Sequence, residues 1–346
     1  MFPSRNAHFL VLTVREGAEG AVRDFLTDVA GIIRAVDFRA TDERLTCVVG
    51  IGAVLWDRLF DAPRPASLRS FTPVVGRVHT AVSTPGDLLF HIRADRPDLC
   101  FELARQIMDA LSGCVDVADE VQGFKYFDNR DLLGFVDGTE NPRNQPALEA
   151  ALVGSDEAPL TGSSYVIVQK YIHDMTSWDS LSVEEQSQAM GRHKLSDIEI
   201  PDAEKADNAH VVLNTIEAPD GTELKIVREN MPFGRPGSEE YGTYYIGYAS
   251  DPAVTERMLE NMFIGDPPGN HDRILDFSTA VTGSLFFVPT IDFLDDPTDA
   301  LEALRRQDPV ARMKDEDRHE PGPTSASEYV NDGSLRIGSL KGADHE

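Results

Sequence analysis

The chain has 346 residues, a length that allows two domains, each with its own core. Its formal net charge is −27 at pH 7, because acidic residues outnumber basic ones. This charge argues against nucleic-acid binding, since no net positive charge remains to neutralise phosphates. No run of about 18 apolar residues is present, so we expect no membrane-spanning helix.

The start of the chain predicts a strand and not a signal peptide. Arg5 is followed by an apolar stretch that alternates into charged residues, without the long apolar core and cleavage site of a signal peptide. The three cysteines, Cys47, Cys100 and Cys114, form no CxxC pair, which fits a reducing compartment. We therefore expect a cytoplasmic protein.

The first half of the chain contains two similar strand–helix–strand passes. Strand patterns alternate with longer helical patterns, an order that is typical of a ferredoxin-like α+β domain. The expected strands are 8–17, 45–52, 87–95 and 121–127, and the expected helices are 20–36 and 99–113.

The second half repeats this inventory with insertions. The expected strands are 164–174, 210–214, 224–230, 243–249 and 284–290, and the expected helices are 178–193, 254–263 and 273–281. The repeated order predicts a duplicated ferredoxin-like fold with antiparallel sheets and peripheral helices. We expect an N-terminal domain over 1–145, a C-terminal domain over 146–296 and a flexible tail over 297–346.

The tail changes composition twice. Residues 312–327 are dense in charge, proline and serine, which predicts a disordered linker. Residues 333–342 follow with three apolar side chains, Leu335, Ile337 and Leu340, too few to form a core. Such a segment at the end of a polar linker is a candidate docking peptide.

Three segments contain candidate site residues. In Gly134–Pro142, two glycines flank Asp137 and allow backbone to approach a ligand, although a tight turn with Asp137 as a helix N-cap is the commoner explanation of such a pattern. His210 stands at the start of an apolar segment. Ile226, Arg228 and Asn230 alternate along an expected strand, so they line either a pocket wall or an exposed face.

Together these segments resemble the dye-decolourising peroxidases, specifically the bacterial B type, from the first strand to Pro289. The order of the GxxDG segment, the later histidine and the Arg-x-Asn-Met-Pro segment carries the resemblance. It implies one haem b per chain, bound without thioether links because no CxxCH motif is present. It also implies that the haem lies in the C-terminal domain.

The resemblance assigns roles to individual residues. His210 matches the proximal iron ligand, and Arg192 matches a partner of a haem propionate. Asp137, Arg228 and Asn230 match the distal catalytic residues, with the relative weight of Asp137 and Arg228 left open. The expected acidic partner of His210 is Asp272, with Asp276 as the alternative.

The implied activity is reduction of hydrogen peroxide through a ferryl intermediate. The electrons would come from dyes, phenolic or lignin-like compounds or other one-electron donors. An alternative is a haem-binding or haem-iron-releasing protein without significant peroxidase turnover. That alternative needs His210 but not Asp137 and Arg228 together.

The end of the chain resembles the cargo-loading peptides of encapsulin shells. The match is LxIGSLKG over 335–342, with Arg336 where the family often has glycine. It implies docking to an encapsulin shell through residues 333–342, and so a cytoplasmic protein inside a nanocompartment. We also expect a homo-oligomer, with no nucleic-acid and no membrane partner.

Overall fold

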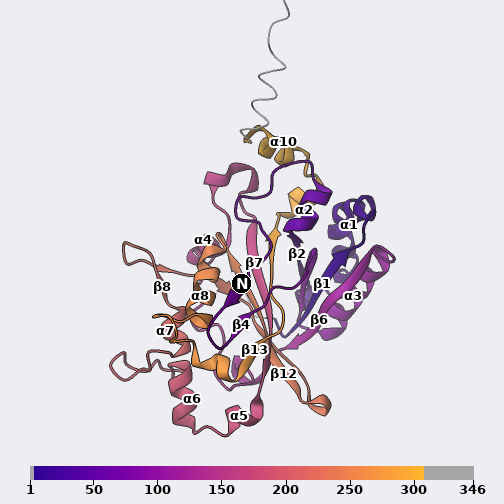
Figure 1. Ribbon diagram of the computed structural model, residues 1–346. Helices are drawn as coiled ribbons and strands as arrows, with labels where there is room; N and C mark the ends of the chain where they lie inside the picture. Colours follow the sequence, from indigo (N-terminus) through magenta and orange to yellow (C-terminus); the bar gives the residue numbers. More distant parts are fainter. Residues whose placement is uncertain (1–3, 308–346) are drawn as a thin grey trace, which may run out of the picture. The chain divides into compact units, whose positions relative to one another are not determined.

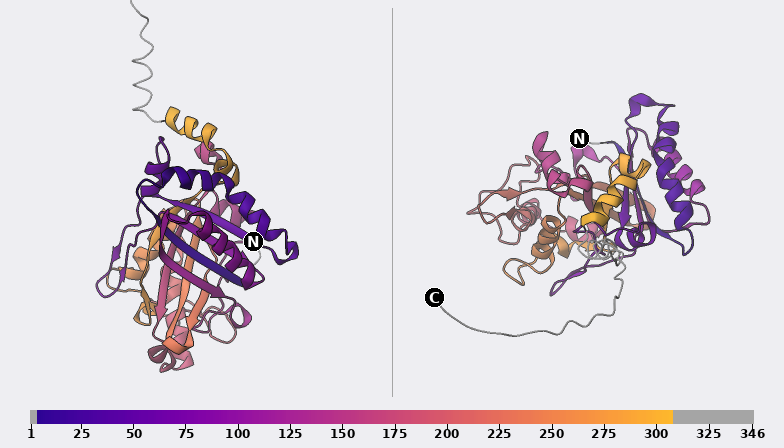
Figure 2. Two further views of the ribbon diagram at one scale, coloured as in Figure 1. Left: turned by 90° about the vertical axis from the view of Figure 1, so that its right-hand side faces the viewer. Right: turned by 90° about the horizontal axis from the view of Figure 1, so that it is seen from above.

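The structure is a computed structural model, and it describes residues 4–307 (Figure 1). In its N-terminal half, four antiparallel strands follow the order β2-β5-β1-β6. Helices α1 and α3 cover one face of these strands (Figure 2). The elements are β1 (Asn6–Val14), α1 (Glu19–Asp37), β2 (Thr46–Gly52), β5 (Leu88–Ala94), α3 (Pro97–Ala110) and β6 (Val115–Phe124).

The amphipathic pattern of α1 explains how it packs. Val22, Phe25, Leu26 and Val29 recur at the spacing of one helix face, and all four are buried. They pack in one core with Leu10 and with the other inward-facing residues of β1. The expected helix 20–36 is therefore confirmed within one or two residues.

The C-terminal half repeats the arrangement. Its strands follow the order β10-β12-β7-β14, so both halves place their second, third, first and fourth strands side by side. All strand pairs are antiparallel, which confirms the predicted duplicated ferredoxin-like fold. The elements are β7 (Ser164–His173), β10 (Val227–Arg228), β12 (Glu240–Ala249), α8 (Ala253–Phe263) and β14 (Ser284–Val288), with β11 (Met231–Arg235) and β13 (Ser278–Ala280) added.

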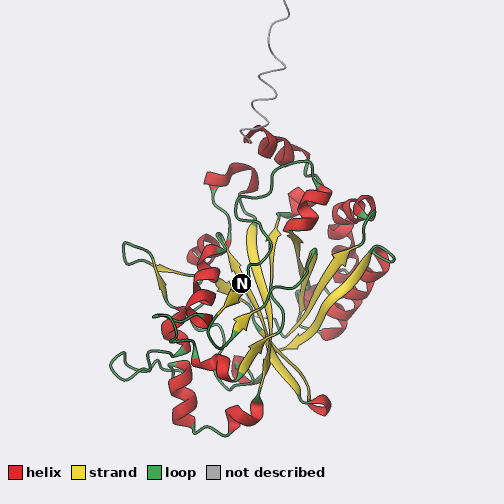
Figure 3. Cartoon of the chain, in the orientation of Figure 1, coloured by secondary structure: helices red, strands yellow, loops and turns green. Residues whose placement is uncertain are grey.

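The two halves share one continuous sheet (Figure 3). Strand β14 pairs with β2, with Phe286 opposite Gly52 and Phe287 opposite Ile51. A Cβ atom at Gly50 would lie 2.9 Å from the Cβ of Phe286, so a glycine lets the aromatic side chain pack against the strand. A second core then forms from residues of both halves, including Phe9, Tyr244 and Phe286.

Two expected elements are wrong. Residues 210–214 form the short helix α7 (His210–Asn214) and not a strand. Residues 273–281 form the 3₁₀ helix η5 (Arg273–Asp276) followed by β13, and not one helix. Both segments are fixed by tertiary hydrogen bonds that local propensity does not encode.

Other boundaries move. The strand expected over 121–127 begins at Val115, and the one expected over 224–230 divides into β9 (Glu223–Leu224) and β10. The helix expected over 178–193 divides into α5 (Met175–Asp179) and α6 (Val183–Met190). Helix α6 begins with a capping box between Ser182 and Glu185.

The remaining elements lie around this framework. They are η1 (Thr41–Glu43), α2 (Ala53–Leu59), β3 (Val74–Val75), β4 (Thr80–Ala81), η2 (Phe127–Asn129), α4 (Gln145–Ala151), η3 (Ser155–Leu160), β8 (Ile216–Glu217), η4 (Pro236–Ser238), α9 (Ile291–Asp295) and α10 (Thr298–Gln307). Strands β3 and β4 pair as a hairpin, and β8 and β9 form another.

The segment expected to be a flexible tail begins with helix α10, in which Leu301 and Leu304 are buried. The predicted linker over 312–327 and docking peptide over 333–342 lie outside the described residues. Within residues 4–307, no helix is both long and apolar enough to cross a membrane.

Candidate active site

A pocket lies in the C-terminal half between the sheet and the helices that cover it. Its lining atoms enclose about 1040 Å³, including the mouth. It is lined by residues of β7, β10 and β12, of α6, α7, α8 and η5, and of the turn segment 131–140. Apolar lining residues include Leu133, Phe135, Met190, Met258, Leu259, Met262 and Ile274. Polar groups at a few fixed points of an apolar pocket are typical of a ligand site.

His210 enters the pocket from the first turn of α7. Its Nδ1 lies 2.7 Å from Oδ2 of Asp272, which is completely buried. The other carboxylate oxygen of Asp272 accepts a hydrogen bond of 3.0 Å from the backbone N–H of Ile274, and this caps η5. Asp272 is thus held from two sides, and Nε2 of His210 is the ring nitrogen left to face the pocket.

Asp276, the alternative partner of His210, lies elsewhere. Its Oδ1 is 3.0 Å from Nε2 of His79 and 3.0 Å from Nε2 of His271. The buried Asp272 is therefore the carboxylate that contacts His210, as expected first.

A second histidine, His173, also lines the pocket. Its two ring nitrogens lie 2.8 Å from the Ser278 hydroxyl and 2.9 Å from the Thr243 hydroxyl. Burial lowers the pKa of His173 to about 4, so the ring is neutral. Because both nitrogens of His173 are engaged, His210 is the better candidate for a metal ligand.

Asp137 and Asn230 meet in the same pocket. The amide of Asn230 donates a hydrogen bond of 3.3 Å to Oδ1 of Asp137, and its oxygen accepts one of 3.1 Å from the N–H of Ile246. The backbone N–H of Asp137 donates to the carbonyl of Asn129 at 2.9 Å. Asp137 lies in a turn and caps no helix, so the simple N-cap interpretation of the glycine-rich segment fails.

Arg228 is positioned by a residue that sequence analysis missed. The side-chain amide of Asn141 donates to the Arg228 carbonyl at 2.6 Å and accepts from the Arg228 N–H at 2.9 Å. Gly138 has φ +77°, and a Cβ atom there would lie 3.1 Å from this amide. The glycine therefore lets the turn close around Asn141. Arg228 and Asn230 line the pocket, whereas Ile226 packs with Ala249 and Met258.

Arg192 lies at the pocket wall and is largely buried. Its guanidinium donates to the Asp197 carbonyl at 2.8 Å, forms an ion pair with Glu140 and lies 3.4 Å from Glu199. A carboxylate ligand would have to share the guanidinium with Glu140 or displace it.

The pocket also contains Asp131, a second residue that sequence analysis missed. Burial raises the pKa of Asp131 to about 7, and the nearby charge of Asp137 adds to this effect. Its Oδ1 accepts a hydrogen bond of 2.9 Å from the N–H of Phe135. Asp131 precedes Gly134 by three residues, so only the proximity of the GxxDG segment pointed to it.

Comparison with known proteins assigns this fold and site to a class. The profile described as "Dyp-type peroxidase, N-terminal" matches residues 3–125, and the profile described as "Dyp-type peroxidase, C-terminal" matches residues 128–293. The chain belongs to the Dyp-type peroxidases, which confirms the resemblance found in the sequence. Its predicted enzyme class, peroxidase, is confirmed with it.

Similar proteins span nearly the whole chain. A dye-decolorizing peroxidase of Brevibacterium linens is 59% identical and covers 99% of this chain and 95% of its own length. The encapsulated DyP-type peroxidase of Mycobacterium smegmatis is 57% identical, with a TM-score of 0.84 over 86% of this chain and 96% of that one. A variant of DypB from Rhodococcus jostii RHA1, solved in complex with heme, is 54% identical with the same TM-score and coverage.

Proposed function

We propose that this Dyp-type peroxidase holds its one haem b non-covalently in this pocket, with His210 as the proximal iron ligand. The observation that carries the proposal is the 2.7 Å contact between His210 and the buried Asp272. The contact leaves Nε2 as the nitrogen that faces the pocket. A carboxylate that accepts the Nδ1–H also gives the imidazole more anionic character, which suits a peroxidase.

The pocket residues fit a haem. Methionine, leucine and isoleucine side chains from α6, α8 and η5 suit the apolar macrocycle. Arg192 offers a guanidinium to a propionate, in exchange for part of its contact with Glu140. The pocket is also lined by three polar side chains, Asp137, Arg228 and Asn230. Arg228 and Asn230 come from β10 and its end, and Asp137 comes from the turn beside the sheet.

When bound, the haem supplies the iron at which hydrogen peroxide is cleaved. The Asp137 carboxylate, held by the Asn230 amide, can take a proton from one peroxide oxygen and return it to the other. The positively charged Arg228 guanidinium can stabilise negative charge on the leaving oxygen. Asn141 helps to position this side chain, because it bonds both the carbonyl and the N–H of Arg228. Asn230 orients Asp137 and the incoming peroxide.

The reducing substrates are dyes, phenolic or lignin-like compounds, or other one-electron donors. A haem-binding or iron-releasing protein is the alternative, and it needs only an axial ligand. The gathering of Asp137, Arg228 and Asn230 in one pocket supports turnover instead. Steady-state oxidation of a dye with hydrogen peroxide, compared with the release of free porphyrin, distinguishes the two activities.

The ligand assignment is tested by comparing two histidine variants. We expect His210→Ala to lose most of its haem, and His173→Gln to retain it because the hydroxyl-bound ring is not a ligand. The measurement is the ratio of haem to protein after purification, with axial ligation followed spectroscopically. Normal haem content and ligation in His210→Ala would overturn the assignment.

We further propose that residues 333–342 address the enzyme to an encapsulin shell in the cytoplasm. The M. smegmatis relative, which is 57% identical, is an encapsulated peroxidase. Leu335, Ile337 and Leu340 would each contribute on the order of 1–3 kcal/mol when buried against the shell. Docking by one peptide would be weak, and an oligomer that presents several tails would strengthen it.

Co-expression with the shell tests this address. The full-length chain is compared with a chain that lacks 333–346 and with a chain in which 333–342 is scrambled at constant composition. We expect haem absorbance in the shell fraction only for the full-length chain, with turnover unchanged in all three. Equal loading of the scrambled chain would refute the address.

A further inference from the structure

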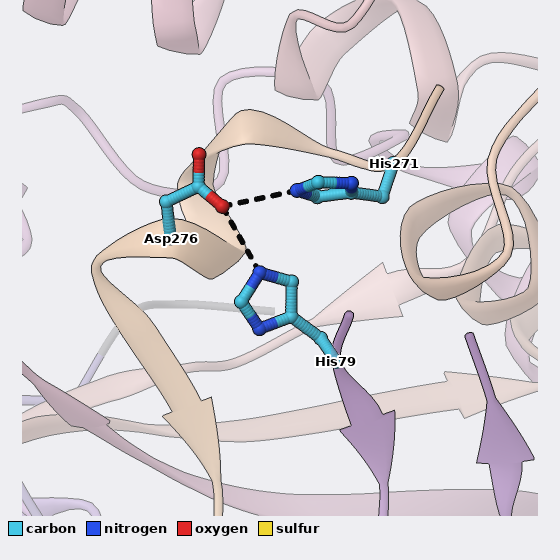
Figure 4. A group of neighbouring side chains, drawn as sticks. All are labelled: His79, His271 and Asp276. Atoms are coloured by element: carbon cyan, nitrogen blue, oxygen red, sulfur yellow. Dashed lines mark hydrogen bonds and ion pairs between the residues drawn. The ribbon is translucent and has the colours of Figure 1, made fainter. Parts of the chain in front are cut away.

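Three side chains that are not part of the pocket lining converge on one point of the surface. The Nε2 atoms of His79 and His271 each lie 3.0 Å from the same Asp276 oxygen (Figure 4). The candidate ligand atoms of all three lie within 4.8 Å of one another. This triad (His79, His271 and Asp276) is not used by the proposed peroxidase reaction.

The backbone holds the triad in place from both halves of the chain. His79 lies in the turn of the β3–β4 hairpin, where its carbonyl accepts a hydrogen bond of 3.0 Å from the N–H of Gly76. A Cβ atom at Gly76 would lie 1.8 Å from the carbonyl oxygen of Phe263, so only glycine lets the hairpin pack on the end of α8. The triad is therefore assembled by the fold and not by one flexible loop.

The residue types and spacing match a transition-metal site. Ligand atoms around a tetrahedral zinc ion lie roughly 3.3 Å apart, given metal–ligand bonds of about 2.0–2.2 Å. The two Nε2–Oδ1 distances of 3.0 Å are already on this scale. Two imidazoles and one carboxylate are a common set for zinc, and they leave a fourth position open.

The triad is accessible to an ion from solution. The side chains of His79, His271 and Asp276 are 23%, 22% and 45% exposed. A simple ion pair is the competing explanation, as for His8, whose Nε2 lies 2.9 Å from Glu120. The triad differs because two rings share one carboxylate oxygen, an arrangement that a divalent ion can bridge while both rings stay neutral.

We propose that His79, His271 and Asp276 bind a divalent ion of the zinc class. The bound ion links the β3–β4 hairpin to the segment that supports the pocket, because His271 directly precedes Asp272 and Asp276 ends η5. The ion stabilises the segment that carries the His210 partner. The proposal does not depend on the proposed haem chemistry, since it concerns a separate group of ligands.

The test uses the full-length, haem-loaded protein and Zn²⁺ in equilibrium dialysis, with zinc and iron counted separately by mass spectrometry. We expect one zinc per chain at about 100 µM Zn²⁺, and at least a tenfold weaker affinity in His79→Gln and in Asp276→Asn, a loss of about the size seen when a metal site is impaired. His193→Gln, a histidine outside the triad, is the control and should bind as the wild type does.

Two further measurements keep the proposal falsifiable if one variant folds poorly. Zinc should raise the melting temperature of the wild type but not that of the triad variants, because it binds only the folded site. A large excess of Mg²⁺ should not displace it, since magnesium prefers oxygen ligands. No zinc in the wild type, equal affinity in folded triad variants, or displacement by Mg²⁺ would each overturn the site.

Discussion

The contact between His210 and Asp272 sets the electronic character of the imidazole that faces the pocket. In Asp272→Asn, a neutral amide replaces the carboxylate, so the ring donates less electron density. We expect this variant to retain haem and to show a higher reduction potential for the haem iron. A redox titration followed by absorbance measures the shift.

Asp207→Asn is the control for this experiment. It removes the same charge from an exposed position three residues before His210. We expect its potential to equal that of the wild type. If both variants shift the potential equally, the effect is one of net charge and not of the hydrogen bond.

Arg228 is the one positively charged residue that we propose to stabilise negative charge on the leaving oxygen. Arg228→Leu should keep haem and slow the reaction with hydrogen peroxide by at least about a hundredfold, the scale of losing one such donor. Stopped-flow absorbance measures this rate directly. Asp137→Ala should slow the same step, and a larger effect than that of Arg228→Leu would reverse the order of importance.

Arg235→Leu provides the matched control, because Arg235 is highly exposed at the end of β11.

Asn141→Ala offers a graded test of positioning. It removes both hydrogen bonds to the Arg228 backbone but leaves the guanidinium in the protein. We expect a smaller loss of rate than in Arg228→Leu. A rate equal to that of the wild type would show that Asn141 does not position Arg228.

At the scale of single elements, the failed predictions lie next to the site. The segment 210–214 contains Val211 and Val212, whose β-branched side chains favour a strand. It forms α7 because Asn214 bonds back to the His210 carbonyl at 2.8 Å and Asp272 holds the His210 ring. Contacts between residues about sixty positions apart cannot be obtained from local propensity.

Several pocket residues were named from the sequence, although the elements that carry them were not predicted correctly. His210, Arg228 and Asn230 were found because the order of three motifs resembled a family, and all three line the pocket. Asp131 and Asn141 were missed because nothing in the sequence distinguishes them from the other polar residues in and beside the GxxDG segment. Their importance appears only when burial and hydrogen bonds are known.

Strand β5 contains a histidine that makes stability depend on pH. His91 is completely buried, and its Nδ1 lies 2.7 Å from the Tyr248 hydroxyl. Burial, with a contribution from the charge of Arg93, lowers the pKa of His91 well below its ordinary value. Below about pH 6.5 the unfolded chain therefore binds a proton that the folded chain does not, so the free energy of unfolding falls as pH falls.

The variant His91→Gln tests this effect. We expect the urea midpoint of the wild type to fall more between about pH 7 and about pH 5 than that of the variant, because the variant lacks the titrating group. Other titrating groups are common to both proteins and cancel in the comparison. Parallel changes in the two midpoints would exclude His91 as a cause.

At the scale of the whole molecule, the two ferredoxin-like halves share a sheet and a core, and the described residues up to Arg305 belong to one compact unit. The predicted division into 1–145, 146–296 and 297–346 stays a prediction. The fold class was predictable because both halves repeat one sequence of elements. The pairing of β14 with β2 was not, because it depends on how the halves pack.

An ion pair joins the halves beside the pocket. Arg93 on β5 contacts Glu229, the residue between Arg228 and Asn230, and both side chains are largely buried. Burial raises the pKa of Glu229, although the charge of Arg93 opposes the rise. Removing one partner leaves a buried charge uncompensated, so Arg93→Met should lower the free energy of unfolding by about 3–5 kcal/mol.

The double variant Arg93→Met/Glu229→Met isolates the cause of this loss. Replacing both partners by apolar side chains removes the uncompensated charge, and such replacements are often close to neutral for stability. We therefore expect the double variant to recover most of the stability lost in Arg93→Met, as measured by urea unfolding of the haem-loaded proteins. If the pair acts only through stability, the double variant also reacts with peroxide at the wild-type rate. A double variant that is stable but reacts slowly would show that the pair positions Arg228 across the interface between the halves. A double variant that is no more stable than Arg93→Met would show that Arg93 acts through packing and not through its charge.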